Sequence, residues 1–436
     1  MSKYFRDVLQ IFEKGVSEVT GFNSVGNFLN NHKISGNYQL IAIGKAADSM
    51  SLAVMKSKNI NIENGIVITK ENHLSSEILE YENLQCIESS HPSPTEKSIN
   101  AGERLINFIE STKIDDQFLI LISGGGSSLV ECLSDGVNLD ELKQYTEHLL
   151  WNGYSISEIN NFRKKISKIK GGKLSIFLNK RKTLALYISD VPEDKLSVIA
   201  SGPLVKDDNI ISDDAYDDFI KGKLLKIKTS MCPPDDFFKK IENHIVAKIE
   251  NAKRSCEKES ISLGYKTFFH EKFIEGDVKD LSNYFSEFLH SCDKGLHIWG
   301  GESSVMLPNN PGRGGRNQQL ALLMAKKIRG KDIIFLSAGT DGTDGPTNDA
   351  GGIVDGETED KGFLLGLDID TFLNNADAGS YLNSTDSLVT TGPTGTNVMD
   401  LIIALKNWLN FFKLYWVFIT RNITGVIVPI TQDVSS

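Results

Sequence analysis

The stretch Phe118-Leu119-Ile120-Leu121-Ile122-Ser123-Gly124-Gly125-Gly126-Ser127-Ser128 sets the fold class. Its five consecutive apolar residues predict a buried strand, and the glycines end that strand in a tight turn that opens a helix. Similar short apolar runs occur at residues 40–43, 65–68 and 184–188. Because these runs alternate with helical stretches, we predict an α/β fold with a parallel sheet covered by helices on both faces.

Length, composition and charge describe an ordinary globular protein. The chain has 436 residues and is 40% hydrophobic and 24% charged, which suits two soluble domains. Its 47 Lys and Arg residues against 57 Asp and Glu residues give a net charge of −10. Such a chain attracts neither nucleic acid nor an anionic membrane through bulk charge, so we expect neither partner. An anionic substrate would need a local basic cluster.

The cysteines and the N-terminus indicate a cytoplasmic location. The five cysteines are scattered and have no CxxC spacing, which indicates neither a zinc site nor a disulfide framework. Residues 1–10 are polar and lack the apolar core of a signal peptide. We therefore expect a cytoplasmic protein.

Two helices are predicted in the first quarter of the chain. Residues 4–30 have an amphipathic pattern. A second helix is expected over residues 94–110, with Ser93 as its N-cap, Pro94 at its first position and Glu96 completing a capping box.

The acidic, turn-rich residues 207–236 are the expected passage between two domains. We place an N-terminal domain at residues 1–230 and a C-terminal domain at residues 231–405. The latter would begin with a long helix that carries four apolar residues on one side, namely Phe238, Ile241, Ile245 and Ile249. The aromatic-rich tail at residues 406–436 is too short an apolar run to span a membrane. We favour a terminal strand or docking segment there over a partner surface.

The glycine-rich turn after residues 118–122 favours anion binding. Consecutive glycines free several backbone N–H groups to point at one ligand. The dinucleotide fingerprint is broken, because Leu129 occupies the place of its last glycine. A simple tight turn is the alternative. The candidate residues for phosphate or substrate binding are Ser123, Gly124, Gly125, Gly126 and Ser127.

Lys45 and Asp190 each follow a predicted strand. Lys45 stands in Ile43-Gly44-Lys45-Ala46-Ala47, where a strand turns into a helix and a cation can reach an anion at the helix N-terminus. The P-loop spacing is absent. Asp190 ends a strand at the edge where open α/β sheets bind ligands. The alternatives are a solvated lysine and an Asx turn.

Residues 161–172 are strongly basic, with Arg163 as the candidate substrate-binding cation. A solvated helix face is the alternative. Nucleic-acid binding is disfavoured, because no aromatic residues are interleaved with the cations.

Glycine-rich loops of the C-terminal half concentrate charge. Glu302 ends a predicted strand, and Arg313 and Arg316 follow in Gly312-Arg313-Gly314-Gly315-Arg316. We prefer Arg316 as the phosphate-binding residue because it precedes the helical run 317–327 and sits at its positive end.

Two further loops add carboxylates, hydroxyls and an amide. Asp341 and Asp344 lie in residues 339–347, and carboxylate oxygens suit Mg²⁺. Asp341 is slightly preferred as the metal ligand. Thr394 and Asn397 lie in residues 391–397 and could orient a hydroxylated substrate. We interpret His91, between Ser90 and Pro92, as structural.

These motifs, in this order, resemble the class II glycerate kinases, which are glycerate 2-kinases with a MOFRL C-terminal domain. The resemblance covers roughly residues 4–405. The matching segments are IGKAA (43–47), SHPSPTEKS (90–98), ISGGGSSL (122–129), FRKKISKIKGGKL (162–174), ISDVPEDKLSVIASGP (188–203), GGESSV (300–305), GRGGRNQ (312–318), AGTDGTDGPTNDAGG (338–352) and TGPTGTNVMDL (391–401). Three residues depart from the expected pattern: Glu193 replaces a glycine, Ser303-Ser304 replaces two threonines, and Gln319 replaces a glutamate.

The resemblance implies an N-terminal Rossmann-like, three-layer domain with a parallel sheet and a C-terminal α/β domain with a mixed sheet. The active site would lie in the cleft between them. It also implies ATP- and Mg²⁺-dependent phosphorylation of D-glycerate to 2-phosphoglycerate. Residues that match Lys45 and Arg316 would be central to catalysis, with Asp190 as the base. Asp341, Glu302 and Asp344 are the candidate metal ligands.

Two other functions remain as alternatives. One is an NAD(P)H-dependent hydroxypyruvate or tartronate reductase, which the broken dinucleotide fingerprint disfavours. The other is a non-catalytic protein that binds sugar acids or phosphates. The sequence leaves the oligomeric state open, with a homodimer as one alternative.

Overall fold

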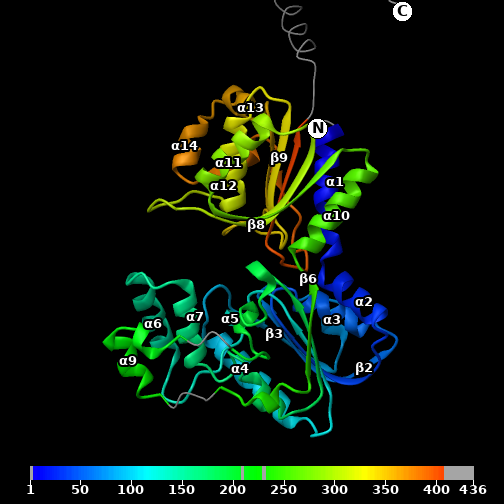
Figure 1. Cartoon of the computed structure of the whole chain (residues 1–436), viewed down its shortest axis with the longest axis vertical. Coiled ribbons are helices and arrows are strands. Elements are labelled where there is room, and N and C mark those ends of the chain that lie inside the picture. Colours follow the sequence, from blue (N-terminus) through cyan, green and yellow to red (C-terminus); the bar gives the residue numbers. More distant parts are fainter. Residues whose placement is uncertain (1–2, 208–210, 228–231, 407–436) are drawn as a thin grey trace, which may run out of the picture.

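Two six-stranded sheets, one in each of two lobes, form the framework of the protein (Figure 1). The computed structural model describes residues 3–207, 211–227 and 232–406. The α/β class is confirmed, with one parallel and one mixed sheet.

The first sheet is parallel throughout. Its strand order is β3 (Leu84–Ser89), β2 (Ile60–Lys70), β1 (Gly36–Ile43), β4 (Phe118–Ile122), β5 (Thr183–Ile188) and β6 (Ile241–Ala247). The central strands β1, β4 and β5 are apolar because both of their faces are buried. The sheet order reverses beside β1, so a crevice forms at the carboxyl ends of β1 and β4.

Helices cover both faces of this parallel sheet. Leu40 and Ala42 of β1 pack toward α2 (Gly21–Asn31) and α3 (Ala47–Met55), whereas Ile41 and Ile43 pack toward α4 (Glu96–Ser111) and α8 (Leu174–Leu178). Beside the sheet, a separate apolar cluster joins three helices, α6 (Leu139–Trp151), α7 (Ile156–Lys165) and α9 (Asp218–Leu224). The three-layer N-terminal fold is therefore confirmed.

The second sheet is mixed. Its strand order is β11 (Leu388–Val389), β10 (Gly351–Asp355), β9 (Ile333–Gly339), β12 (Asp400–Lys406), β8 (Gly295–Ser304) and β7 (Thr267–Asp277). Only the β7–β8 pair is parallel. Its outer face packs against helices that include α11 (Val278–Ser291) and α12 (Arg316–Lys327). Three shorter helices complete this lobe, α13 (Thr358–Leu364), α14 (Ile369–Asn374) and α15 (Ala378–Ser384).

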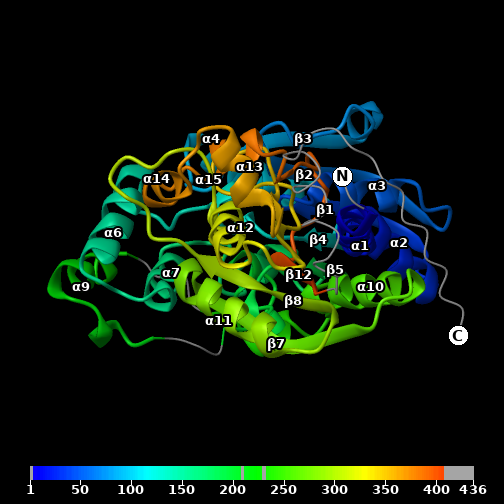
Figure 2. The same ribbon diagram turned by 90° about the horizontal axis from the view of Figure 1, so that it is seen from above.

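The first helix of the chain packs on the second lobe. Helix α1 (Lys3–Glu18) lies beside α10 (Ile249–Ser262) and covers the inner face of the mixed sheet (Figures 1 and 2). Gly15 allows this approach, because a Cβ there would lie 2.3 Å from the sulfur of Cys256. The chain then crosses to the first lobe between α1 and α2. It returns between β6 and α10.

Several expectations about individual elements are wrong. Residues 4–30 form two helices, because Thr20 leaves the helical conformation and caps α2. Helix α4 begins two residues later than predicted, with Thr95 as N-cap and Ser98 completing the capping box. The apolar residues near Ile241 and Ile245 form strand β6, not a long helix, and the helix begins at Ile249.

The described residues of the expected interdomain passage at residues 207–236 contact the first lobe. Tyr216, Ile220 and Leu224 pack against α6 and α7, and β6 then joins the parallel sheet. The sheet of the first lobe thus continues to Ala247. The residue numbers of the domain division stay a prediction, as does the tail at residues 406–436, which lies outside the described residues except for Lys406. Among the helices that the structure describes, none is long and apolar enough to cross a membrane.

Candidate active site

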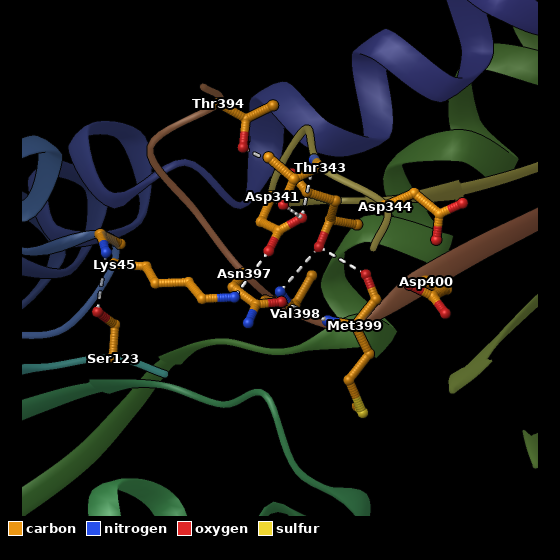
Figure 3. Close-up of polar contacts among 12 residues, drawn as sticks. Lys45, Ser123, Asp341, Thr343, Asp344, Thr394, Asn397, Val398, Met399 and Asp400 are labelled. Carbon is orange, nitrogen blue, oxygen red and sulfur yellow. Dashed lines mark hydrogen bonds and ion pairs between the residues drawn. The ribbon is translucent and has the colours of Figure 1, made fainter. Parts of the chain in front are cut away.

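The two lobes meet at an ion pair. Lys45 follows β1 of the first lobe, and Asp341 follows β9 of the second. Lys45 Nζ lies 2.9 Å from Asp341 Oδ2 (Figure 3). Asp341 Oδ1 accepts hydrogen bonds from the backbone N–H and the hydroxyl of Thr343, both at 3.1 Å. Burial acts to raise the pKa of Asp341, but the Lys45 ammonium and the hydrogen bonds from Thr343 together hold that pKa below its ordinary value. Asp341 is therefore ionised beside a cation.

The glycine-rich turn after β4 presents unused backbone donors to this site. Within the described residues, the N–H groups of Gly124, Gly125, Gly126 and Ser127 donate to no protein acceptor. Gly125 has a φ of +83°, and a Cβ there would lie 3.0–3.3 Å from His91 and Lys45. A row of free amides beside a lysine is suited to an anion. Ser123 has a different role, because its hydroxyl accepts the N–H of Ala46 at 3.0 Å.

Asp190 lies against this turn. A Cβ on Gly124 would stand 1.9 Å from Asp190 Oδ2 and 3.1 Å from Asn397 Nδ2, so the carboxylate and the amide meet above Gly124. Burial raises the pKa of Asp190 to about 6, while the Lys45 charge acts in the opposite direction. A carboxylate with such a pKa is ionised at neutral pH and accepts a proton more readily than an exposed aspartate.

Arg316 is held by two carboxylates of the second lobe. It is the first residue of α12. Its Nε and Nη2 donate to the two oxygens of Asp400, at 2.8 and 3.1 Å, and its Nη1 lies 3.0 Å from Glu302 Oε1. Burial acts to lower the pKa of Arg316, but the surrounding carboxylates, above all Asp400 and Glu302, together raise that pKa. Burial raises the pKa of Glu302. Arg316 is thus permanently charged, and its guanidinium group is held in a fixed orientation by Asp400 and Glu302.

Asp344 caps helix α12. Its Oδ1 and Oδ2 accept the backbone N–H groups of Asn317 and Gln318 at 3.0 and 2.8 Å. Burial raises the pKa of Asp344 to about 7. Because both oxygens already accept backbone donors, the geometry favours a capping role over a metal-binding one. The metal role of Asp344 stays a prediction.

The loop 391–399 contributes polar side chains to the site, among them Thr394 and Asn397 (Figure 3). Thr394 donates its hydroxyl to the Thr340 carbonyl at 2.6 Å, so this hydroxyl can only accept a hydrogen bond from a ligand. Asn397 Oδ1 accepts the N–H of Met399 at 3.2 Å. That bond leaves its Nδ2 facing Gly124 and Asp190.

Two predicted arginines have their described contacts outside this group. The Nη2 of Arg313 lies 2.5 Å from Asp349, and its backbone N–H donates to Asp377, which ties it within the second lobe. Arg163 is largely buried near Glu131, which pairs with Lys170, and burial lowers the pKa of Arg163. Its Nε and Nη2 have no hydrogen-bond partner among the described residues. Substrate-binding roles for both arginines stay predictions.

Sequence reasoning missed Asp400, a neighbour of the site, and interpreted His91 as structural. Asp400 is 2% exposed and anchors Arg316; its place in the motif at residues 391–401 was the available signal. His91 packs beside Gly125 and Lys45, and burial lowers its pKa to about 4, so it is neutral there. The departure at Glu193 also has a structural consequence. Glu193 has a φ of +60°, a conformation that favours the glycine expected there.

The donor set fits a magnesium ion that is bound together with phosphates. Within the described ranges, no group of three or more His, Cys, Asp or Glu side chains is spaced to hold a metal ion. Mg²⁺ in kinases commonly uses one or two carboxylates, substrate phosphates and water, so it needs no complete protein cage. The carboxylates nearest to the two candidate cations are Asp341, which pairs with Lys45, and Glu302, which pairs with Arg316 and lines a cavity.

The comparisons with known proteins bear on the family and the fold of the chain. Models of a domain of unknown function (DUF4147) and of the MOFRL family match residues 7–230 and 295–400. The chain is 34% identical to glycerate 2-kinase of Pyrococcus horikoshii, over 86% of this chain and 88% of the relative. It is 38% identical to D-glycerate 2-kinase of Thermotoga maritima, over 84% and 90%. A putative hydroxypyruvate reductase of Agrobacterium vitis is 33% identical, over 84% and 98%.

A solved structure extends the match to the fold. The crystal structure of glycerate kinase from Thermotoga maritima superposes with a TM-score of 0.81 at 32% identity, covering 93% of this chain and all of that chain. The chain therefore belongs to the class II glycerate kinase (glycerate 2-kinase) family with a MOFRL domain, and is a phosphotransferase with an alcohol group as acceptor.

Proposed function

We propose that this protein transfers the γ-phosphoryl group of ATP to the 2-hydroxyl of D-glycerate and forms 2-phosphoglycerate. The observation that carries the proposal is the meeting of Lys45 and Asp341 across the lobes, beside Asp190 and the free amides of the glycine turn. Cations, free amides and a poised base within one cleft are what phosphoryl transfer to an alcohol requires.

The first lobe would hold the acceptor. The free N–H groups of Gly124–Ser127 suit the carboxylate of glycerate. A substrate held there would lie beside Asp190, because that carboxylate packs on Gly124. Asp190 would accept the proton of the 2-hydroxyl as the hydroxyl oxygen bonds to the γ-phosphorus. The bond from that phosphorus to the bridging oxygen breaks, and ADP leaves.

The second lobe would hold the donor. Arg316, which is clamped by Asp400 and Glu302, would stabilise the γ-phosphoryl oxygens as negative charge redistributes. Lys45 would do so from the opposite lobe, exchanging part of its contact with Asp341 for phosphate. Magnesium, when bound with ATP, neutralises phosphate charge, and Asp341 and Glu302 are the residues that would hold it.

The reductase alternative receives less support from the site. A pyrophosphate would have to approach the glycine turn after β4, where the Asp190 carboxylate already packs on Gly124. The helix that follows, α5 (Gly126–Leu129), is a single turn, which gives a weak dipole. A pyrophosphate beside Asp190 meets more repulsion than the single carboxylate of glycerate, whose 2-hydroxyl can also donate a hydrogen bond to Asp190, and the short helix offsets little of that repulsion.

One assay tests the proposal against its alternatives. ADP formation and NAD(P)H oxidation are followed with D-glycerate, L-glycerate and hydroxypyruvate. We expect ADP with D-glycerate only. Lys45→Ala and Arg316→Ala should lose turnover while the folded protein remains. Lys56→Ala and Arg329→Ala, which remove one partner of an exposed surface ion pair, should keep turnover. Wild-type turnover in both site variants would overturn the proposal, as would NAD(P)H oxidation without ADP.

A further inference from the structure

A cavity of about 550 Å³ opens beside Arg316, outside the group around Lys45. Its walls come from the ends of β7 and β8, from the loops at Gly314–Arg316 and Gly345–Pro346, and from Pro192 of the first lobe. Cavities that bind small molecules measure about 300–1,000 Å³. The space is therefore large enough for an organic group, and it begins where a phosphate would lie.

The outer wall of this cavity is apolar. Phe273, Val305 and Leu307 line it, together with Pro346. Leu307 is 59% exposed, so much of this apolar surface is open to a ligand. An aromatic ring and aliphatic side chains at the edge of a polar site are suited to a flat heteroaromatic base, which stacks on them.

The cavity is positively charged at its Arg316 end and negatively charged at its Glu275 end. Arg316 contacts Glu302, and Glu302 lies opposite Glu275 on the neighbouring strand. Adjacent strands are about 4.8 Å apart, so the charge changes from positive to negative within one or two strand spacings. Phosphates would be attracted to Arg316 and repelled from Glu275. A carboxylate at the Glu275 position accepts hydrogen bonds from sugar hydroxyls.

We propose that this cavity binds the nucleoside of the phosphoryl donor, with the adenine ring against Phe273 and Leu307 and the ribose beside Glu275. The phosphates then extend past Glu302 to Arg316. The proposal rests on the proposed function for the identity of the donor, and it adds where and how the donor's base and sugar are held. The base would be recognised at the edge strand of the MOFRL sheet, away from the acceptor.

Calorimetric titration with ADP tests the base contact independently of turnover. Phe273→Ala should weaken ADP binding by about tenfold or more, the loss expected for one stacking contact. Leu307→Ser, in an exposed loop, should weaken it less and serves if Phe273→Ala perturbs β7. Phe363→Ala is the matched control, because Phe363 is 75% exposed on the same lobe. In the steady state, the KM for ATP should rise while the KM for D-glycerate stays unchanged.

The contact between Glu275 and the ribose is tested separately, by comparing the affinities for ADP and for an analogue without the ribose hydroxyls. The wild type should bind ADP more tightly than 2′,3′-dideoxy-ADP, and Glu275→Gln should reduce that preference. Unchanged ADP affinity in both Phe273→Ala and Leu307→Ser, or a rise in the KM for D-glycerate alone, would overturn the proposal. If the wild type binds ADP through Phe273 but makes no product from D-glycerate, the nucleoside site stands and the proposed acceptor falls.

Discussion

Arg316→Lys separates the charge of this residue from its geometry. Arginine contacts Asp400 through two N–H groups and Glu302 through a third, at 2.8, 3.1 and 3.0 Å. Lysine keeps the charge but has one ammonium group, which cannot match this planar fork. A displacement of about 1 Å in a catalytic group can reduce turnover about 10²-fold. We therefore expect Arg316→Lys to lower kcat about 10²-fold, and Arg316→Ala roughly 10³-fold or more.

Stability must be measured alongside turnover, because Asp400 is only 2% exposed. Removal of one partner from a fully buried pair costs about 3–5 kcal/mol. The Arg316 side chain is 34% exposed, so we reduce this to about 1–3 kcal/mol for Arg316→Ala, and expect less for Arg316→Lys. The assay follows ADP release at saturating D-glycerate and ATP, with Tm by calorimetry. Near wild-type kcat in a folded Arg316→Lys protein would refute the geometric role, and Arg329→Lys is the matched surface control.

Three further predictions concern individual carboxylates. The kcat/KM should rise with pH through about 6 and then level off, because Asp190 must be ionised to accept a proton; Asp190→Asn should be slow and lack this rise. Burial raises the pKa of Asp344 to about 7. Between about pH 4 and pH 7, Asp344 therefore holds a larger fraction of a proton in the folded protein than in the unfolded chain. Its contribution to the free energy of unfolding falls as the pH rises through that window. Asp344→Asn should therefore shrink the drop in Tm between pH 5 and pH 8, and an undiminished drop would contradict this. Glu193→Gly should raise the free energy of unfolding by up to about 1 kcal/mol, because it relieves a φ of +60°; denaturant titration that shows a loss would refute it.

The parallel sheet could be predicted because its strands carry strong local signals. The run at Phe118–Ile122 is buried throughout, and the glycine turn that follows it lies at the carboxyl edge of the sheet. Strand β6 could not be read in the same way. It is the edge strand and is only half-buried, so its residues Ile241 and Ile245 also fit a helical spacing. Placement of α1 on the second lobe depends on contacts more than 200 residues apart, which local patterns do not encode.

Several candidate residues that the sequence indicated lie together in the structure, and their roles stay predictions. The motifs indicated Lys45, Asp190 and Asp341 as candidate site residues, and in the structure Lys45 and Asp341 form an ion pair. Asp400 was missed although it lies in the motif at residues 391–401, because its contact with Arg316 joins residues that are 84 positions apart in the chain. The capping contacts of Asp344 depend on the start of α12, more than 25 residues away. Long-range hydrogen bonds therefore decide which carboxylates remain free for a ligand.

The position of the phosphate in the product tests the central claim most directly. Phosphorus NMR of a reaction that contains the enzyme, Mg-ATP and D-glycerate is compared with standards of both phosphoglycerates. The arrangement of Asp190 beside the free amides of Gly124–Ser127 predicts 2-phosphoglycerate and an equal amount of ADP. Formation of 3-phosphoglycerate, or no phosphorylated glycerate at all, would contradict the account.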